Sequence, residues 1–413
     1  MAIAEEATME HGAPTIQMKF TEEQNALRET VAKFAQDEMV PVLDEMDEKE
    51  EFPVKTVQRM KDLGFFGVPV PEEYGGLGMG KVGYCIMLEE LGKFDASHPA
   101  ILGAHTSLGM SPLLYYGTEE QKQKFLAPAA RGEKLMGFSL TEPHSGSDSG
   151  ALKTEAKEEG DYWVLNGNKI FVTNGKEADQ IVVMAANDAN LGSNGGITAF
   201  LVEKGTKGFK VGRCEKKMGL HGTSTAELIF ENCAVPKGNI IGGVGKGFYV
   251  AMTALDVGRV SLGAGSCGGI WGSLNVGLNY ANNRMQFDAP IIQYQAIQFK
   301  LADMAMHLHA LRTMVYQAAA FQDSIGYDPK KWSRSDRLKK SRDSAVIKCL
   351  GSEWASKAVS EALQIHGGIG YIRGTPIERA YRDARISEIF EGTNEVQRMI
   401  IAGDLIGRNG FVP

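Results

Sequence analysis

The stretch Arg382–Gln397, RDARISEIFEGTNEVQ, decides the interpretation of this chain. It has the pattern of a helix end that enters a tight loop, and it places the carboxyl group of Glu391 directly before a Gly-Thr-Asn sequence. A carboxylate on a loop held by helices is a good position for a general base. Taken alone, the stretch could equally be an ordinary helix C-terminus with Gly392 as its cap.

Length and composition narrow the class of protein. The 413 residues are too many for one ordinary hydrophobic core, so we expect two or three packed regions. Hydrophobic residues make up 43% and charged residues 23%, which is typical of soluble globular proteins. The net charge of -7 argues against a nucleic-acid-binding protein and does not favour anionic membranes. No uninterrupted apolar run reaches the ~18 residues of a membrane span.

The N-terminal sequence and the cysteines bear on cellular location. The first twenty residues include three glutamates and no long apolar run, so they resemble neither a secretory signal nor an Arg-rich transit peptide. We interpret residues 1–17 as a flexible extension. The cysteine number is odd and no CxxC pair exists, which predicts free thiols in a reducing cytoplasm. The cysteines are Cys85, Cys214, Cys233, Cys267 and Cys349.

Residues 18–133 have a helical pattern. Thr21-Glu22-Glu23-Gln24 is a capping-box sequence, and apolar residues follow at helical spacing. Pro41 marks a break or a turn in this segment. Further helices are predicted at 54–63, 82–91, 99–114 and 119–127.

Residues 134–244 have the pattern of a compact β region with several short strands. The runs 162–165 and 169–172 flank Asn166-Gly167-Asn168, a combination that predicts a β-hairpin. Further strands are predicted at 181–185, 197–202 and 227–230. Residues 245–413 are helical again, with long periodic segments at 248–284, 294–325, 335–363 and 376–405. The predicted fold class is α+β, with an N-terminal α-helical domain, a small middle β domain and a C-terminal four-helix-bundle-like α domain.

A second motif, TEPHSGSD at 141–148, lies far upstream of Glu391. A Gly/Ser surface loop is the ordinary interpretation of a lone GSD sequence. Here the motif lies before the predicted hairpin and is followed, in order, by RMQF at 284–287 and IFEGTNE at 389–395. In combination, these motifs resemble the acyl-CoA dehydrogenase family, and the resemblance extends from Thr21 to Arg408.

The resemblance implies the acyl-CoA dehydrogenase fold and FAD-dependent α,β-dehydrogenation of an acyl-CoA thioester to the 2-enoyl-CoA. Glu391 matches the family's catalytic base, which takes the α-proton while flavin N5 takes the β-hydride. We expect apolar surroundings to raise its pKa, and its backbone N–H to polarise the thioester carbonyl. Another branch of the family carries its base at the position of Gly258, which cannot serve. Electrons would pass to an electron-transferring flavoprotein. Subunit-spanning cofactor contacts imply an oligomer, which in this family is usually a homotetramer, while a dimer stays open.

The resemblance also implies binding residues in several motifs. For Phe171, stacking on the flavin competes with a plain β-core position, and for Asp256 and Arg259, contact with CoA competes with a surface ion pair. The implied FAD-binding residues are Phe138, Leu140, Thr141, Ser147, Phe171, Thr173, Arg284, Gln286, Phe287, Gln295, Gln364, Gly367, Gly368, Thr393 and Glu395. The implied substrate-binding residues are Ser147, Asp256, Arg259 and Gly392. Departures from the family pattern are His144, Asp288 and Glu395.

Two further sequence patterns do not indicate a functional site. His307 and His309 point to different helix faces, so we expect no metal site. The seven basic residues at 330–342 are interpreted as a solvated connection between two helices.

The alternative function is an acyl-CoA oxidase-like flavoenzyme that uses oxygen as acceptor, although similar oxidases tend to be longer. The helix around Ala100, Ile101, Ala104 and His105 is expected to line the far end of the acyl cavity. Because no arginine lies between Ser97 and Leu114, a dicarboxylic substrate is disfavoured, while short, medium, branched and cyclic chains stay open.

Overall fold

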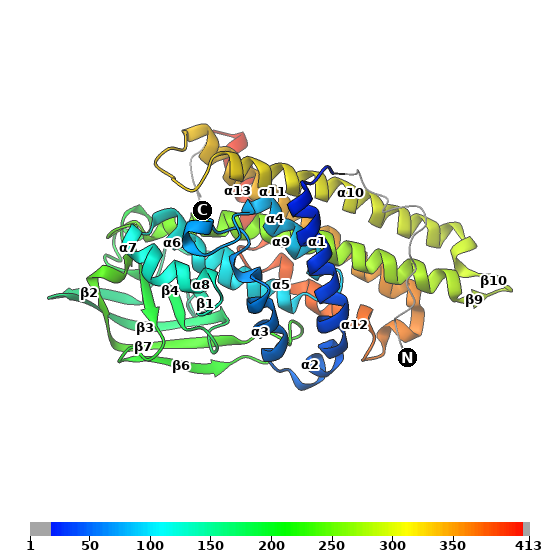
Figure 1. Cartoon of the computed structure of the whole chain (residues 1–413), viewed down its shortest axis with the longest axis horizontal. Coiled ribbons are helices and arrows are strands. Elements are labelled where there is room, and N and C mark those ends of the chain that lie inside the picture. The colour runs from blue at the N-terminus through cyan, green and yellow to red at the C-terminus, as the bar shows by residue number, and fades with distance from the viewer. Residues whose placement is uncertain (1–17, 408–413) are drawn as a thin grey trace.

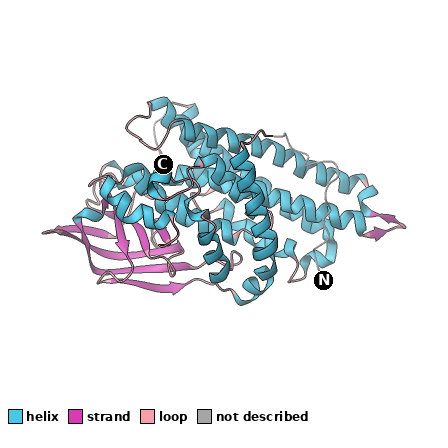
Figure 2. Ribbon diagram, viewed as in Figure 1, coloured by secondary structure: helices cyan, strands magenta, loops and turns pink. Residues whose placement is uncertain are grey.

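The computed structural model describes residues 18–407, and the predicted flexible extension at 1–17 lies outside the described residues. Figure 1 shows an elongated molecule with a β-sheet at one end and a small hairpin, β9 and β10, at the other. N-terminal helices and long C-terminal helices fill the space between them (Figure 2). This arrangement confirms the predicted α+β fold class with its helical, β and helical regions. The domain boundaries at 133/134 and 244/245 stay predictions.

The N-terminal region is a set of short helices. Gln24 donates its backbone N–H to Thr21 Oγ1 at 3.2 Å, and Thr21 donates to Gln24 Oε1 at 3.0 Å, so the predicted capping box is present. At Pro41 the chain passes through a 3-10 turn rather than ending its helical course. The helices are α1 (Glu22–Phe34), α2 (Leu43–Lys49), α3 (Val54–Asp62), α4 (Gly80–Gly92), α5 (Ser97–Leu102), α6 (Ser111–Tyr116), α7 (Glu119–Gln121) and α8 (Ala127–Ala130), with π-helical turns η1 (Ala35–Met39), η5 (Gly103–Met110) and η6 (Lys122–Leu126).

The middle region is an eight-stranded sheet in the order β6-β7-β3-β2-β4-β5-β8, with β1 pairing β4 in parallel. Strands β4 and β5 are buried almost throughout because they lie under the helices. The strands are β1 (Met136–Ser139), β2 (Glu155–Glu159), β3 (Tyr162–Thr173), β4 (Gln180–Ala186), β5 (Ile197–Glu203), β6 (Phe209–Cys214), β7 (Thr225–Pro236) and β8 (Ile240–Ile241).

The hairpin predicted at Asn166-Gly167-Asn168 is wrong, because β3 runs without a turn through these residues. Residues on both sides of Gly167 pair with the same neighbour, β7, and the register shifts between Leu165 and Gly167. Gly167 has φ of 148°, and a Cβ there would lie 2.7 Å from the Cα of Thr154. The glycine therefore permits a bulge and a close approach of strands instead of a reversal.

The C-terminal region is built on three long helices, α9 (Gly247–Asn283), α10 (Gln295–Ser324) and α11 (Arg334–His366). Two short helices follow, α12 (Pro376–Ala384) and α13 (Asn394–Leu405), separated by the 3-10 turn η11 (Arg385–Glu388) and a loop. The single periodic segment predicted at 376–405 is therefore two helices. Strands β9 (Met285–Gln286) and β10 (Ala289–Pro290) form the hairpin between α9 and α10, and the 3-10 turn η10 (Gly367–Tyr371) follows α11.

Helix α9 connects the three regions. Its first turns pack on the sheet, where Val250 shares a core with Val182 and Leu201. Further along, its residue Ile270 shares a second core with Leu88 of α4 and with residues of α10 and α11. Side chains on α9 can therefore face the N-terminal helices, the sheet and the C-terminal helices from one rigid element.

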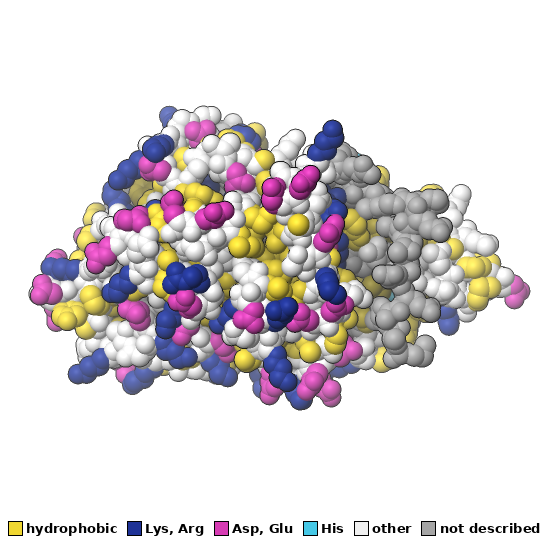
Figure 3. All heavy atoms as spheres, in the orientation of Figure 1, with side chains coloured by type: hydrophobic (Ala, Val, Ile, Leu, Met, Phe, Trp, Pro, Cys, Tyr) yellow, Lys and Arg dark blue, Asp and Glu magenta, His cyan; other side chains and the backbone are white. Residues whose placement is uncertain are grey.

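Basic and acidic side chains are interspersed over the face drawn in Figure 3, with apolar side chains between them. Within residues 18–407, none of the helices combines the length and apolar character that crossing a membrane requires.

Candidate active site

A cavity of about 2440 Å³ lies where the N-terminal helices, the sheet and the C-terminal helices meet. It is lined by residues of α4, α5, η5, β1, β3, α9, α12 and the loop before α13. Single ligand sites in proteins usually measure about 300–1,000 Å³. The cavity therefore has room for more than one ligand of ordinary size.

The loop that carries Glu391 has an unusual backbone. Glu391 has φ of 56° and Gly392 has φ of 89°, so two consecutive residues are in the left-handed region. Gln397, fully buried on α13, donates its side-chain amide to the carbonyl of Gly392 at 2.8 Å. Thr393 caps α13 by accepting a backbone N–H at 3.3 Å. The helix start and the buried amide together hold the strained loop in place.

The carboxyl group of Glu391 is turned inward. The residue as a whole is half-buried, but its Oε2 atom is buried and accepts no hydrogen bond from the described residues. A methyl group added at Gly258 would overlap this oxygen and would lie 3.0 Å from both the Cδ of Glu391 and a methyl of Leu108. Burial raises the pKa of Glu391 to about 7, against the opposing charges of Arg259 and Lys348. The expectation of a raised pKa is thus supported by the structure.

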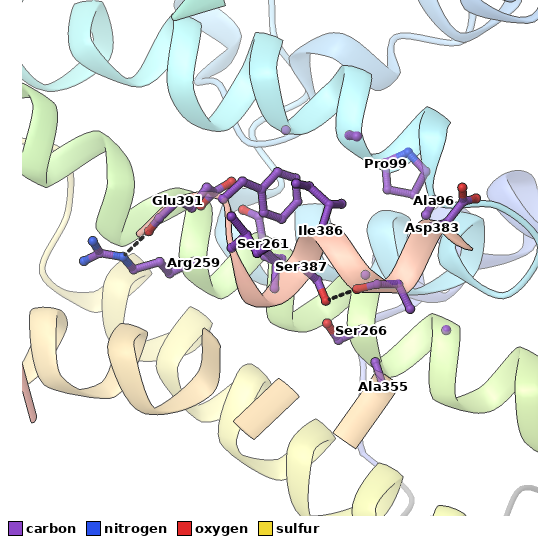
Figure 4. A pocket seen from close by; sticks show the side chains of 18 of the residues that line it. Ala96, Pro99, Arg259, Ser261, Ser266, Ala355, Asp383, Ile386, Ser387 and Glu391 are labelled. Carbon is purple, nitrogen blue, oxygen red and sulfur yellow. Dashed lines mark hydrogen bonds between the residues drawn. The ribbon is translucent and has the colours of Figure 1, made fainter. Parts of the chain in front are cut away.

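Arg259 and Asp256 lie on α9 next to this loop. Arg259 donates Nη1 to Asp256 Oδ1 at 2.9 Å. It also donates Nε to the carbonyl oxygen of Glu391 at 3.2 Å, a bond that is drawn in Figure 4. Both side chains are buried, so the alternative of a surface ion pair is wrong. Arg259 therefore joins the wall of the cavity to the Glu391 loop.

A second buried cation, Lys348 of α11, was not anticipated. It is fully buried and donates Nζ to Asn394 Oδ1 at 2.8 Å, while Asn394 donates to Ser352 Oγ at 3.0 Å. Burial lowers the pKa of Lys348 to about 8, against the nearby carboxyl of Glu391. A lysine within a helical pattern normally predicts a solvent-facing position, so no sequence signal indicated this contact.

The upstream motif forms the sheet side of the cavity. Phe138, Leu140, Thr141 and Ser147, which the resemblance implies as FAD contacts, all line it. Glu142 holds the loop in place. It accepts hydrogen bonds from the backbone N–H groups of Lys153 and Thr154, and it forms an ion pair with Lys169 Nζ at 2.7 Å. Burial would raise the pKa of Glu142, but these donors outweigh it and hold the pKa below its usual value. The departure His144 lies half-exposed, 3.2 Å from the same carboxyl group.

Phe171 and Thr173, at the end of β3, also line the cavity. Phe171 has φ of 59° and lies at a register shift between β3 and β7, so the bulge turns its side chain out of the sheet. The residue is 61% exposed, which excludes the plain β-core alternative.

The remaining implied cofactor residues are not brought to this cavity within one chain. Residues near the β9–β10 hairpin and at the end of α11 are exposed, and Phe287 is 90% exposed. Glu395 is exposed on α13, one residue after its start. The residues outside the cavity lining are Arg284, Gln286, Phe287, Gln295, Gln364, Gly367, Gly368 and Glu395. Thr393, Gly392, Asp256 and Arg259 do line it.

The expected acyl-lining helix is placed partly as predicted. Ala100 and Ala104 line the cavity, but Ile101 and His105 do not. His105 is fully buried on the other side of the helix and accepts the backbone N–H of Met136 at 2.9 Å, and burial lowers its pKa to about 3.

His307 and the basic stretch 330–342 both pack against aromatic side chains. His307 stacks on Trp354 with ring centroids 4.9 Å apart. The basic stretch 330–342 is not simply a solvated connection, because most of it forms the first turns of α11 and Lys340 is buried against Trp332 and Tyr115. Within residues 18–407, no three His, Cys, Asp or Glu side chains are grouped so as to hold a metal ion.

Three family models match the chain in succession. The acyl-CoA dehydrogenase N-terminal domain matches residues 21–133, the middle domain matches residues 137–233, and the C-terminal domain matches residues 245–406. The chain belongs to the acyl-CoA dehydrogenase family. It is therefore an oxidoreductase of a family that uses FAD.

Individual members of the acyl-CoA dehydrogenase family are similar over almost the whole chain. An acyl-CoA dehydrogenase of Bacillus subtilis is 43% identical, over 94% of this chain and 100% of the relative. The mitochondrial short-chain specific acyl-CoA dehydrogenase of Rattus norvegicus is 42% identical, over 94% of this chain and 91% of the relative.

Solved structures agree with this similarity. A chain from a study of the electron transferring flavoprotein of Acidaminococcus fermentans and flavin-based electron bifurcation is 41% identical, with a TM-score of 0.89 over 95% of this chain and 100% of that one. An acyl-CoA dehydrogenase complexed with FAD, from Bacillus anthracis, is 37% identical, with a TM-score of 0.87 over 94% of this chain and 68% of that one.

Proposed function

We propose that the protein catalyses the α,β-dehydrogenation of an acyl-CoA thioester to the 2-enoyl-CoA and passes the electrons to an electron-transferring flavoprotein. The observation that carries this proposal is the carboxyl group of Glu391, a residue that lines the cavity: its Oε2 is buried beside Gly258 and accepts no hydrogen bond among residues 18–407. A carboxyl group whose pKa lies near 7 is matched to taking a proton from carbon at neutral pH.

The residues on the sheet side of the cavity fit an FAD site. The cavity has space beyond one ordinary ligand, and Phe171 offers an aromatic ring that is turned out of the sheet into it. Phe138, Leu140, Thr141, Ser147, Phe171 and Thr173 would hold the cofactor from this side. FAD, when bound, supplies the acceptor for the hydride that leaves the β-carbon.

Glu391 would accept the α-proton of the substrate. An ionised carboxylate is costly in this buried position, so accepting the α-proton removes a buried charge. Arg259 holds the Glu391 carbonyl oxygen, and Gln397 holds the carbonyl oxygen of Gly392, so the loop does not have to reorganise during the reaction. The backbone N–H of Glu391 as a donor to the thioester oxygen stays a prediction.

The CoA part of the substrate would lie along α9. Asp256, Arg259, Gly392 and Ser147 line the cavity near the Glu391 loop and would contact it. Because Asp256 and Arg259 are already paired with each other, they would present fixed polar groups to the ligand.

Partners are inferred from two observations. A similar chain was solved in work on an electron transferring flavoprotein, which supports that acceptor. The exposed residues at the β9–β10 hairpin and the end of α11 would complete the FAD site of another subunit, which supports an oligomer; the form we propose is a homotetramer. A cytoplasmic location stays a prediction from the cysteine content.

The test is anaerobic reduction of the FAD-loaded protein by acyl-CoA, followed by absorbance of the flavin. Glu391→Gln should keep acyl-CoA binding and lower the rate of flavin bleaching by about 10³-fold, because the base is removed. Glu388→Gln, three residues upstream and outside the cavity lining, is the matched control and should bleach at the normal rate. Normal bleaching by Glu391→Gln would place the base elsewhere. Rapid peroxide formation under air would favour the oxidase-like alternative.

A further inference from the structure

Three buried hydroxyl groups form a hydrogen-bonded chain that joins α4, the π-helical turn η5 and α9. Ser107 Oγ lies 3.2 Å from the hydroxyl oxygen of Tyr84 and 2.9 Å from Ser261 Oγ. At the two ends, Tyr84 donates to the carbonyl oxygen of Leu102 at 3.0 Å, and Ser261 donates to that of Val257 at 3.0 Å. All three hydroxyl-bearing residues are buried, and of the three only Ser261 lines the cavity.

The cavity end of this hydroxyl chain lies beside the carboxyl group of Glu391. Ser261 follows Gly258 by three residues on α9, and side chains with this spacing are neighbours, with Cβ atoms about 5–6 Å apart. The bond from Ser261 to the carbonyl of Val257 directs the hydroxyl group back over the turn that contains Gly258. At Gly258, a Cβ would lie 2.4 Å from Glu391 Oε2. Both Ser261 and Glu391 are drawn in Figure 4.

Two further observations relate the hydroxyl chain to the base. Leu108, which follows Ser107 in η5, has a methyl group 3.0 Å from the same Cβ position at Gly258. Burial is the main cause that raises the pKa of Tyr84, and the charge of Glu391 adds to it. Glu391 Oε2 accepts no hydrogen bond among residues 18–407. The base therefore lacks a partner close to the place where the hydroxyl chain ends.

The hydroxyl chain can run in either direction because each hydroxyl group both donates and accepts. Ser107 has one proton, so it donates either to Ser261 or to Tyr84. When Ser107 donates to Ser261, the Ser261 proton suits an acceptor such as a carboxylate. When Ser107 donates to Tyr84, a lone pair of Ser261 is open to a donor such as a protonated carboxyl group.

We propose that Ser261 is a positioning residue for Glu391, and that Ser107 and Tyr84 let it bind both protonation states of the base. This inference rests on the proposed function. After one side-chain rotation, Ser261 donates to the ionised carboxylate before the reaction. Once Glu391 has taken the α-proton, its O–H donates to Ser261 Oγ and Ser107 turns its proton to Tyr84. The α-proton stays on Glu391, and only hydrogen bonds change along the chain.

This contact favours the ionised form of the base. A hydrogen bond to an ionised group is about twice as strong as one between neutral groups. Ser261 therefore stabilises ionised Glu391 more than protonated Glu391, and it opposes the burial that raises the pKa of Glu391. Without the hydroxyl group of Ser261, a smaller share of the enzyme should hold an ionised base at neutral pH.

The first experiment measures the pKa of Glu391 without turnover. The unfolding free energy of each FAD-loaded protein is compared in urea, from pH 5 to pH 8.5, with that of the same protein carrying Glu391→Gln, and the pH dependence of the difference reports the pKa. Ser261→Ala should raise this pKa by about 0.5–1 pH unit. An equal pKa in Ser261→Ala and the wild type would overturn the proposal.

The matched control for this experiment is Ser273→Ala. Ser273 is also buried on α9, also lines the cavity, and donates to the carbonyl oxygen of Gly269, four residues earlier, at 2.7 Å. It lies twelve residues beyond Ser261, which is about 18 Å along the helix axis. Ser273→Ala should therefore leave the pKa of Glu391 unchanged.

The second experiment tests the reversal of the chain. Tyr84→Phe removes the acceptor that Ser107 needs when Glu391 is protonated, so it should lower the pKa of Glu391, in the opposite direction to Ser261→Ala. A general loss of packing would not move the pKa in opposite directions in the two variants. A pKa that rises or stays the same in Tyr84→Phe would show that the chain does not reverse.

The acidic limb of kcat/KM separates this inference from the proposed function. If the pKa of Glu391 and the limb both rise in Ser261→Ala, with kcat/KM about three- to tenfold lower at pH 6, both stand. If the pKa rises and the limb does not, the contact exists but Glu391 is not the base, so the proposed function fails. If neither moves, the inference fails, and Glu391→Gln still tests the proposed function separately.

Discussion

The raised pKa of Glu391 has a measurable effect on folding stability. The pKa of about 7 compares with a usual value of 4.5, and this difference corresponds to about 3 kcal/mol. Below pH 4.5 the group is protonated in both the folded and the unfolded protein, so it does not change the free energy of unfolding. As pH rises from 4.5 to 7, only the unfolded chain loses the proton, and stability falls. Above pH 7 the full cost is present.

Glu391→Gln removes this cost because the amide has the same shape and does not titrate. We expect the variant to be more stable than the wild type by about 3 kcal/mol at pH 8.5, and within about 1 kcal/mol of it at pH 5. The assay is urea denaturation of the FAD-loaded proteins, with no substrate present. Glu388→Gln is the control, and its difference from wild type should be the same at both pH values.

The outcome that would refute the reasoning is a stability difference for Glu391→Gln that does not grow with pH. Such a result would mean that the carboxyl group is ionised in the folded protein at low pH, with a partner or solvent access that the structure does not have. A second readout is catalytic: kcat/KM of the wild type should fall about tenfold for each pH unit below 7, because only the ionised base reacts.

Three further substitutions test other parts of the site. Lys348→Met removes a charge that lowers the pKa of the base, so the acidic limb of kcat/KM should move up by about one pH unit, whereas the exposed Lys357→Met should leave it in place. Phe171→Ala should raise the dissociation constant for FAD about tenfold in a fluorescence titration, and Tyr162→Ala on the same strand should not. Glu142→Gln leaves the buried ammonium group of Lys169 without its ion-pair partner. The free energy of unfolding, measured by urea denaturation, should fall by about 3 kcal/mol.

Much of the fold was predictable because its local signals agree with its tertiary contacts. The capping box at Thr21 and the long periodic segments of α9, α10 and α11 mark helices that all contribute apolar residues to one core. The hairpin at Gly167 was mispredicted because the glycine serves a contact with Thr154, which lies on a neighbouring segment. Local turn chemistry cannot reveal such a contact.

The site was predictable where residues act through a motif, and not where they act through burial. Glu391, Arg259 and Phe171 were found from their motifs, and they line one cavity. Lys348 and Lys169 were missed because a lysine in a helix or strand usually faces water.

A side chain at position 258 and the carboxyl group of Glu391 would occupy the same volume, although position 258 lies on α9 and position 391 on the loop before α13, far apart in the chain. Any residue larger than glycine at the first position must displace the carboxyl group at the second. A proton acceptor moved onto α9 would consequently need a smaller or redirected residue on the loop in the same step. If the base moved from position 391 to position 258 by single substitutions, the intermediate protein would have either two carboxyl groups in contact or no carboxyl group at either position. We therefore expect positions 258 and 391 to change together or not at all.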